Sequence, residues 1–156
     1  MIRPTLPADS SEIVRLADAT GVFKPLEIVA LSEVLADFFT TNHAHGHQAI
    51  TFLDDVTTLG FAYFAPAAMT DRTWYLYWIA VSKETQAKGI GSQLLQFVEK
   101  EIGRQKGRQL LIETSSLPHY ELTRRFYLKQ DYEQAAVVPD YYAEGDHMIV
   151  FRKRFG

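Results

Sequence analysis

One stretch decides how this sequence is interpreted: Trp78-Ile79-Ala80-Val81-Ser82-Lys83-Glu84-Thr85-Gln86-Ala87-Lys88-Gly89-Ile90-Gly91-Ser92. It starts as the end of an apolar strand, continues as a polar loop, and ends with two glycines that open an amphipathic helix. Gly89 and Gly91 leave their amides unshielded, and the first turn of a helix offers free N–H groups and the positive end of the helix dipole. The stretch therefore predicts an anion-binding site, or else a tight strand-to-helix turn that needs glycine.

Two common phosphate-binding loops do not fit this stretch. A Walker loop needs Lys and then Ser or Thr after its last glycine, whereas Gly91 is followed by Ser92 and Gln93. A Rossmann fingerprint needs a third glycine where Leu94 stands, and its loop after the strand is shorter.

Helical and alternating patterns on either side of this stretch predict an α+β fold with a mixed sheet. Asp9 is expected to cap the first helix, with Glu12 reaching back to its amide. The strand Thr73–Val81 is expected to be buried on both faces in its second half. Strands are predicted at Ile2–Pro4, Gln48–Leu53, Thr57–Ala65, Thr73–Val81, Gln109–Thr114, Tyr132–Val138 and His147–Arg152, and helices from Asp9 to near Gly21, from Pro25, and over Gly89–Gln105 and Tyr120–Lys129.

Composition limits the class of protein. The 156 residues fit one domain, residues 1–156. Lys and Arg number 16 against 19 Asp and Glu, and the net charge of −3 disfavours a general nucleic-acid binder. The chain contains no cysteine, which excludes disulfides, thiolate metal ligands and a cysteine nucleophile. No apolar run approaches the ~20 residues of a membrane span, and no secretory signal is recognisable, so we expect a cytoplasmic protein without a membrane partner.

A family resemblance rests on Gln86-Ala87-Lys88-Gly89-Ile90-Gly91 behind the strand end Ile79-Ala80-Val81. This Gln-x-x-Gly-x-Gly loop resembles the acyl-CoA loop of the GNAT superfamily of N-acetyltransferases. The resemblance covers nearly the whole chain and implies a GNAT-like fold, with a central mixed, mostly antiparallel sheet of about seven strands and about four flanking helices. It also implies direct transfer of the acetyl group of acetyl-CoA, the cosubstrate, to a primary amine, without a covalent enzyme intermediate.

The resemblance assigns contacts to the CoA moiety. The strand before the loop splays from its neighbour in the family and pairs with pantetheine, a role that falls to Ile79, Ala80 and Val81. Gln86 stands where family loops carry Arg or Gln, and Lys88 is either a point charge for a phosphate or a solvated loop lysine. The amides implied to hold the pyrophosphate are those of Lys88, Gly89, Ile90, Gly91 and Ser92.

Tyr127 is the candidate general acid. It lies in Arg124-Arg125-Phe126-Tyr127, which resembles the family helix whose tyrosine often protonates the CoA sulfur. An ordinary tyrosine has a pKa near ~10, so it keeps its proton at neutral pH and can donate it. The alternative role is aromatic packing against the sheet.

Glu113 is the candidate general base. It is the one carboxylate in the otherwise apolar strand Gln109–Thr114, beside the expected splay. Partial desolvation there would raise its pKa toward a useful range for a base. It also matches the glutamate of the ribosomal-protein N-terminal acetyltransferase subgroup, where the base acts through water. The alternative is a strand residue that faces solvent.

The acceptor side is predicted near the C-terminus. The segment 138–146 resembles the Tyr-Tyr acceptor loop of the same subgroup, which implies that Tyr141, Tyr142 and Asp146 bind the acceptor, a peptide α-amine or a small amine. Residues 130–151 are acidic without Lys or Arg, whereas residues 83–108 are mainly basic, which suits a cationic amine on one side and an anionic cofactor on the other. Family members commonly form homodimers, so the resemblance admits a dimer here.

Two further interpretations of the sequence are less favoured. His43, His45 and His47 alternate as metal ligands can, but a polar loop that enters a strand is favoured and no metal is expected. A non-catalytic acyl-CoA-binding module would keep the glycine loop but would need neither Glu113 nor Tyr127. The presence of both favours an enzyme.

Overall fold

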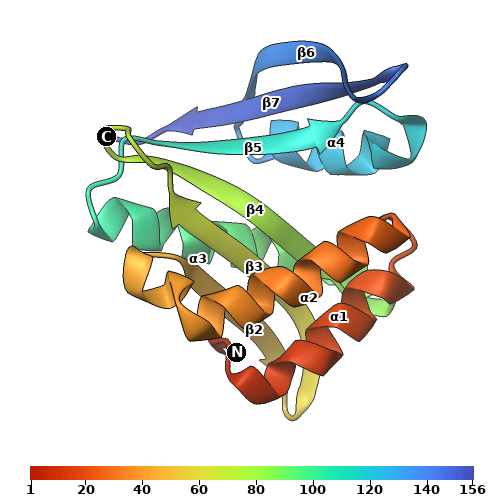
Figure 1. Ribbon diagram of the computed structural model, residues 1–156, viewed down its shortest axis with the longest axis vertical. Helices are drawn as coiled ribbons and strands as arrows, with labels where there is room; N and C mark the ends of the chain where they lie inside the picture. The colour runs from red at the N-terminus through yellow and green to blue at the C-terminus, as the bar shows by residue number, and fades with distance from the viewer.

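Seven strands form one sheet in the order β1-β2-β3-β4-β5-β7-β6 (Figure 1). Neighbouring strands are antiparallel except β4 and β5, which are parallel. This computed structural model describes the backbone of residues 1–156 and every side chain except those of Gln86 and Ala87. The mixed, mostly antiparallel sheet with four α-helices confirms the predicted fold class. The elements are β1 (Ile2–Pro4), α1 (Ser10–Ala19), α2 (Pro25–Thr40), β2 (Gln48–Asp54), β3 (Thr57–Pro66), β4 (Thr73–Val81), α3 (Ile90–Arg104), β5 (Gln109–Ser115), α4 (Glu121–Lys129), β6 (Glu133–Ala143) and β7 (Asp146–Arg154).

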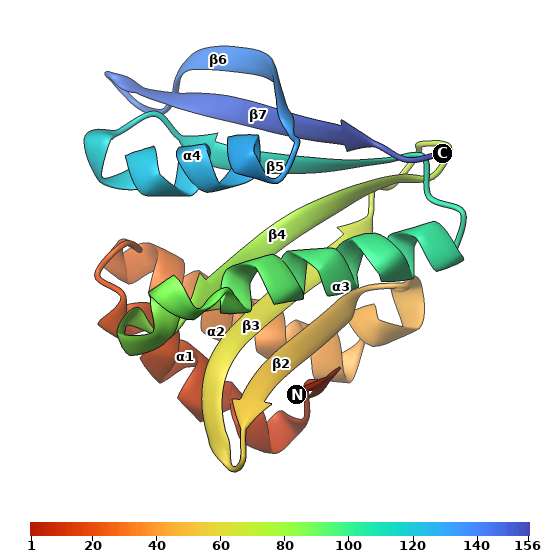
Figure 2. The same cartoon turned by 180° about the vertical axis from the view of Figure 1, so that it is seen from behind.

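Two hydrophobic cores lie on opposite faces of the sheet. Helices α1 and α2 cover one face of β2–β4, and α3 covers the other, as the two opposite views show (Figures 1 and 2). Alternate residues of β3 divide between the cores. Phe61 and Tyr63 pack under α1 and α2, whereas Ala62 and Phe64 pack against α3. This is the alternation that a strand covered on both faces requires. In the described part of the chain, no helix is both long and apolar enough to cross a membrane.

A β-bulge interrupts β4 at Tyr77. The pairing of β4 with β3 skips this residue, since its neighbours Leu76 and Trp78 pair with adjacent residues of β3. The bulge also shifts the alternation, so that Leu76 packs against α3 and Trp78 packs toward α1 and α2. A bulge bends its strand and increases the local twist. The second half of β4 therefore runs in a different direction from its first half.

The parallel ladder between β4 and β5 ends just before this bulge. It joins Thr73–Leu76 to Gln109–Ile112 and goes no further, whereas β5 continues to pair with β7 as far as Ser115. In both views β4 and β5 lie side by side near the C-terminus and diverge toward the other end (Figures 1 and 2). The sheet is therefore split between its fourth and fifth strands.

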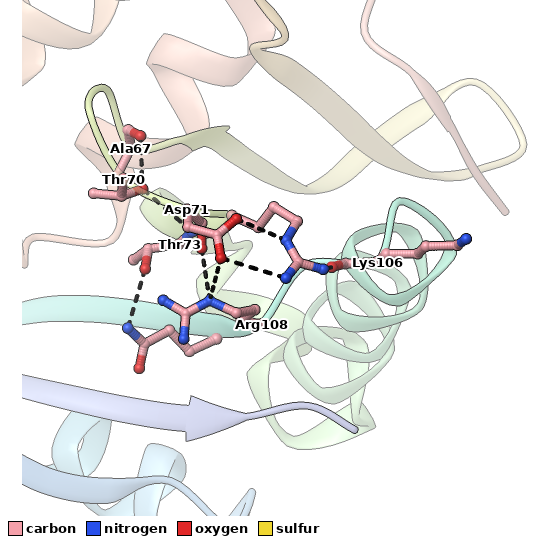
Figure 3. Close-up of polar contacts among 8 residues, drawn as sticks. Ala67, Thr70, Asp71, Thr73, Lys106 and Arg108 are labelled. Carbon is pink, nitrogen blue, oxygen red and sulfur yellow. Dashed lines mark hydrogen bonds and ion pairs between the residues drawn. The ribbon is translucent and has the colours of Figure 1, made fainter.

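Polar contacts hold the two strands together at the closed end of this split. Arg108 Nε donates to the Asp71 carbonyl at 2.7 Å, and Arg72 Nη1 donates to the Lys106 carbonyl at 3.1 Å. The Asp71 carboxylate also forms ion pairs with both arginines, and Figure 3 shows Asp71 and Arg108 side by side. These contacts link the turn before β4 to the turn before β5. They hold the two strands together at the end of the ladder opposite to the split.

One local prediction was wrong. Asp9 does not cap α1 through its side chain. Its carboxylate instead accepts hydrogen bonds from Arg3 Nη1 at 2.7 Å and from the Leu6 amide at 2.8 Å, and Glu12 pairs with Arg15. The Arg3 guanidinium lowers the pKa of Asp9 below its ordinary value. A charged partner supplied by β1 therefore competes successfully with the helix amides for this carboxylate.

Candidate functional site

A cleft of about 680 Å³ opens where β4 and β5 part. Its walls are formed by the second half of β4, the first turn of α3, the second half of β5, and α4. Part of the segment that joins α1 to α2 closes one side. Elements distant in the sequence therefore meet at the split in the sheet.

The strand end that was predicted to contact the cofactor lines this cleft. The prediction that the second half of β4 is buried on both faces was wrong. Tyr77 is 50% exposed, whereas Trp74 and Leu76 of the first half are 5% and 3% exposed. The reason is that β5 leaves after Leu76, so the rest of β4 borders the cleft instead of another strand. The predicted residues found in the wall are Ile79, Ala80 and Val81.

The first turn of α3 faces the same cleft. Gly89 has a φ of 76°, a left-handed conformation that glycine adopts without strain, and it joins the preceding 3-10 turn to the helix. The Gln93 amide bonds to the Gly89 carbonyl at 3.1 Å, so the amides of residues 90–92 lie ahead of this bond, where a helix leaves N–H groups unpaired. Gly89, Gly91 and Ser92 line the cleft.

The remaining predicted cofactor residues are placed differently. Ile90 is 4% exposed and its side chain belongs to the core under α3, which leaves only its backbone for a ligand. Lys88 is exposed and is not part of the cleft wall. The side chain of Gln86 lies outside the described residues.

A chain of polar contacts supports Ser92. Gln130 Nε2 donates to Ser92 Oγ at 2.9 Å, and the Gln130 carbonyl accepts from Lys153 Nζ at 3.0 Å. Lys153 pairs with Glu99 at 3.2 Å, and Glu99 accepts from the Tyr132 hydroxyl at 2.7 Å. Because Ser92 Oγ accepts from Gln130, the Ser92 hydroxyl keeps its own proton for donation.

Tyr127 lies in the cleft wall with its ring in the core. The residue is 3% exposed, and its ring centroid is 5.5 Å from that of Phe126 and 5.5 Å from that of Phe151. Its hydroxyl has no hydrogen-bond partner among the described side chains. Every fully buried polar atom of these side chains does have a partner, so the Tyr127 hydroxyl is not fully buried. The hydroxyl must therefore open onto the cleft. Burial raises the pKa of Tyr127, so the phenol stays protonated at neutral pH.

Glu113 lies opposite, on β5 just past the end of the parallel ladder. Its neighbours Ile112 and Thr114 are 2% and 6% exposed, whereas Glu113 itself faces the cleft. It has no ion-pair partner among the described residues. Partial desolvation by the cleft walls raises the pKa of its carboxyl group. A raised pKa without a paired cation is the state expected of a general base.

A second cavity of about 380 Å³ meets the cleft at the split in the sheet. The two share Tyr77, Trp78, Glu113 and Tyr120, among others. The second cavity extends toward the first turn of α2 and the β6–β7 turn. Glu113 therefore borders a passage between a larger cleft on one side and a smaller cavity on the other.

The predicted acceptor residues separate into two groups. Tyr142 and Asp146 line the second cavity, whereas Tyr141 lines neither cavity and is 58% exposed, with its ring edge-on to Tyr142. The expected loop is in fact the end of β6. Val138 pairs with Met148 and Ala143 pairs with Asp146, so residues 139–142 form a bulge in the strand.

Asp146 is more enclosed than a residue of an exposed acidic loop. It is 3% exposed, and Ser115 Oγ donates to its Oδ1 at 2.5 Å. Lys24 Nζ lies 3.6 Å from its other oxygen. The Asp146 charge is therefore paired within the protein before any ligand arrives.

The alternating histidines are engaged in separate contacts. His43 Nδ1 is 2.8 Å from the Phe38 carbonyl, and His47 Nδ1 is 2.6 Å from the Tyr63 hydroxyl. Burial lowers the pKa of His47, with a smaller contribution from His45. Within the part of the chain that the structure describes, no three His, Asp or Glu residues are grouped to hold a metal ion.

Several residues of the two cavities were missed from the sequence. Tyr75 and Tyr77 were recognised only as strand residues, and the bulge that exposes Tyr77 has no sequence signal in an apolar run. Lys24 and Glu27 lie at the start of α2, where the local pattern indicates a helix start but no ligand. Tyr120 lines both cavities and donates to the Val22 carbonyl at 3.2 Å.

Comparisons with known proteins give consistent results. The sequence model of the acetyltransferase (GNAT) domain matches residues 45–134. A solved structure assigned to the GNAT acetyltransferases, from Desulfovibrio desulfuricans, is 32% identical, with a TM-score of 0.94 over 99% of this chain and 98% of that chain. No curated protein sequence matches significantly.

Two further solved structures share the fold at lower identity. An aminoglycoside 6'-N-acetyltransferase complexed with coenzyme A has a TM-score of 0.80 at 19% identity, over 99% of this chain and 96% of that one. A ribosomal-protein-alanine N-acetyltransferase from Brucella melitensis has a TM-score of 0.81 at 16% identity, over 99% of both chains.

Proposed function

Because the chain belongs to the GNAT family of acetyltransferases, we propose that it moves the acetyl group of acetyl-CoA directly to a primary amine, a peptide α-amine or a small amine, without a covalent enzyme intermediate. As a member of this family it is an acyltransferase with acetyl-CoA as cosubstrate. The observation that carries the proposal is the placement of Glu113 and Tyr127 in the wall of one cleft, at the split between β4 and β5. We also propose that residues 1–156 form a single domain.

Three observations support the fit of acetyl-CoA to the larger cleft. The first turn of α3, the part of a helix whose N–H groups lie ahead of the first intrahelical bonds, lies in the wall of this cleft, which suits a pyrophosphate. The Tyr127 hydroxyl is held in the wall and forms no hydrogen bond with the described side chains. A Cβ atom built on Gly91 would lie 3.4 Å from the Phe126 ring and 3.7 Å from Val81, so glycine at this position keeps the cleft open between α3 and α4.

The chemistry follows from the two side chains. Acetyl-CoA supplies a thioester carbon that the amine nitrogen attacks, so that a C–N bond forms, the C–S bond breaks and the thiolate of CoA leaves. Glu113 is placed at the junction of the two cavities, where it accepts the proton that the amine nitrogen loses. Tyr127 donates a hydrogen bond, and then its proton, to the leaving sulfur.

The second cavity is the proposed acceptor site. It meets the cleft at Glu113, so an amine bound there reaches the acetyl group through the split in the sheet. Three carboxylates line it against one ammonium group, which favours a cationic amine over an anionic molecule. These residues are Glu27, Glu113, Asp146 and Lys24.

A screen of acceptor amines tests the proposal. The purified chain is mixed with acetyl-CoA and single amines, and release of the CoA thiol is followed together with the mass of the product. We expect an acetylated amine with at least one acceptor, and loss of most of this activity in Glu113→Gln. Binding of acetyl-CoA with no amine acetylated above the rate of thioester hydrolysis would contradict the proposed transfer.

A further inference from the structure

We propose that the preferred acceptor is a small aliphatic amine with a second positive charge, of the diamine type, and that Glu27 holds this second charge. The inference rests on the proposed function, because it takes the second cavity as the acceptor site. It goes further by naming the acceptor class and a residue that selects it. Neither was predicted from the sequence.

The carboxylates of the second cavity are not equivalent. Asp146 is 3% exposed and is already bound by Ser115 and Lys24. Glu113 and Glu27 have no cationic partner within the described part of the chain. The cavity therefore presents two uncompensated negative charges, one at its junction with the cleft and one on the first turn of α2. A bound molecule with two positive charges would match both.

Glu27 is held in a defined position. Its Oε1 accepts a hydrogen bond from the Lys24 amide at 2.9 Å, which ties the side chain back to the start of α2. A carboxylate has two oxygens with about four acceptor sites, so most of its capacity is left for a ligand. The neighbouring Lys24 ammonium is turned toward Asp146 instead, at 3.6 Å.

Aromatic rings form much of the wall between these two charges. Tyr75 and Tyr77 are stacked with centroids 5.4 Å apart, and Phe23 packs on Trp78 at 5.4 Å. Such surfaces suit a hydrocarbon spacer, and their faces attract ammonium groups. All four rings line the cavity, together with Tyr120 and Tyr142.

Tyr142 shares the cavity wall with the three carboxylates Glu27, Glu113 and Asp146. Burial raises its pKa to about 12, and the negative charges of Glu113, Asp146 and Glu27 all contribute in the same direction. One phenol therefore lies within electrostatic reach of all three carboxylates. A cavity of about 380 Å³ is also in the range of small-molecule sites, which favours a compact acceptor.

The same features disfavour an acceptor that carries a carboxylate, such as a free amino acid. The described wall of the cavity offers one cation, Lys24, and Asp146 already pairs with it. A carboxylate would therefore have to break this pair and approach Glu27. A second ammonium group meets no such obstacle.

The test compares acceptors that differ only in the second charge. Straight-chain diamines from diaminopropane to diaminohexane are assayed against monoamines of the same length, with acetyl-CoA and the full chain. We expect kcat/KM to be higher for at least one diamine than for its matched monoamine. Glu27→Gln should lower this diamine-to-monoamine ratio about fivefold, the effect of an ion pair worth about 1 kcal/mol.

Glu33→Gln is the matched control, because it removes the same charge from α2 at an exposed position that lines neither cavity. This variant should keep the wild-type ratio. The inference would be overturned if diamines and monoamines were used equally well, or if amino acids were preferred. It would also be overturned if Glu27→Gln left the diamine-to-monoamine ratio unaltered, or if both variants lowered this ratio equally. In each of these cases acetyl transfer itself would stand. Absence of transfer to every amine would instead overturn the proposed function.

Discussion

Replacing Tyr127 by phenylalanine separates its chemical role from its packing role. The substitution keeps the ring against Phe126 and Phe151 and removes only the hydroxyl. That hydroxyl has no hydrogen-bond partner among the described side chains and opens onto the cleft. The variant should therefore fold with a free energy of unfolding within about 1 kcal/mol of the wild type, since no intramolecular hydrogen bond is lost.

The expected loss of rate follows from the environment of the hydroxyl. A general acid contributes typically about 10²- to 10⁴-fold. Burial raises the pKa of Tyr127, which makes the phenol reluctant to release its proton, so the low end of this range is expected. We predict a fall in kcat of about 10²-fold, equivalent to about 2.7 kcal/mol of transition-state stabilisation, with nearly unchanged affinity for acetyl-CoA.

Tyr132→Phe provides the opposite control. Its hydroxyl donates to Glu99 at 2.7 Å, and the residue is not part of the cleft wall. This variant should lose about 1.5–3 kcal/mol of stability, because a hydrogen bond to a charged group is removed, and should keep its kcat. Single-turnover thiol release and thermal unfolding are measured for both variants. An unchanged single-turnover rate in Tyr127→Phe would refute the assignment of Tyr127 as the acid.

Three further predictions concern the base, the phosphate end and the acceptor cavity. Since Glu113 must be deprotonated to act, kcat/KM should fall as the pH drops through its raised pKa, and a pH–rate profile of Glu113→Gln should lack this acidic limb. Gln130→Leu should raise the KM for acetyl-CoA severalfold, because Gln130 positions Ser92. The KM for S-acetylpantetheine, which has no pyrophosphate to contact Ser92, should not change. Equal effects on both thioesters would assign Gln130 to packing. Tyr142→Ala should raise the KM of the acceptor and leave acetyl-CoA affinity alone, with Tyr141→Ala as the control outside the cavity; weaker acetyl-CoA binding would place Tyr142 in the cofactor site.

The parts of the fold that were predictable depend on local patterns. The strand Thr73–Val81 was predicted with its observed bounds, and helix α3 within one residue at each end, because an apolar run, a glycine turn and a helical stripe succeed one another. Gly89 and Gly91 were predicted at the helix start for the same reason. Glu113 was predicted to be partly desolvated because it is the carboxylate of an apolar strand, and its raised pKa agrees.

The parts that were missed depend on tertiary contacts. The bulge at Tyr77 is hidden because the residues around it are apolar whichever face they occupy. The prediction that Asp9 caps a helix failed because its partner, Arg3, comes from a separate strand. Asp146 was predicted in a loop that binds the acceptor. Its ion pair was not predicted, because Lys24 lies far from it in the sequence. Glu27 stands in a local pattern that indicates only the start of a helix, and its relation to the cavity exists only in the folded chain.

Calorimetric titration with acetyl-CoA tests the central claim most directly, when wild type is compared with Gly91→Leu and Gly103→Leu. Both glycines lie in α3, so the two variants change helix propensity alike. A side chain at Gly91 would enter the cleft between Phe126 and Val81, whereas a Cβ on Gly103 meets nothing within 4 Å. The account predicts that wild type and Gly103→Leu bind acetyl-CoA and that folded Gly91→Leu does not. Binding by Gly91→Leu with wild-type affinity, or no binding by wild type at millimolar acetyl-CoA, would contradict it.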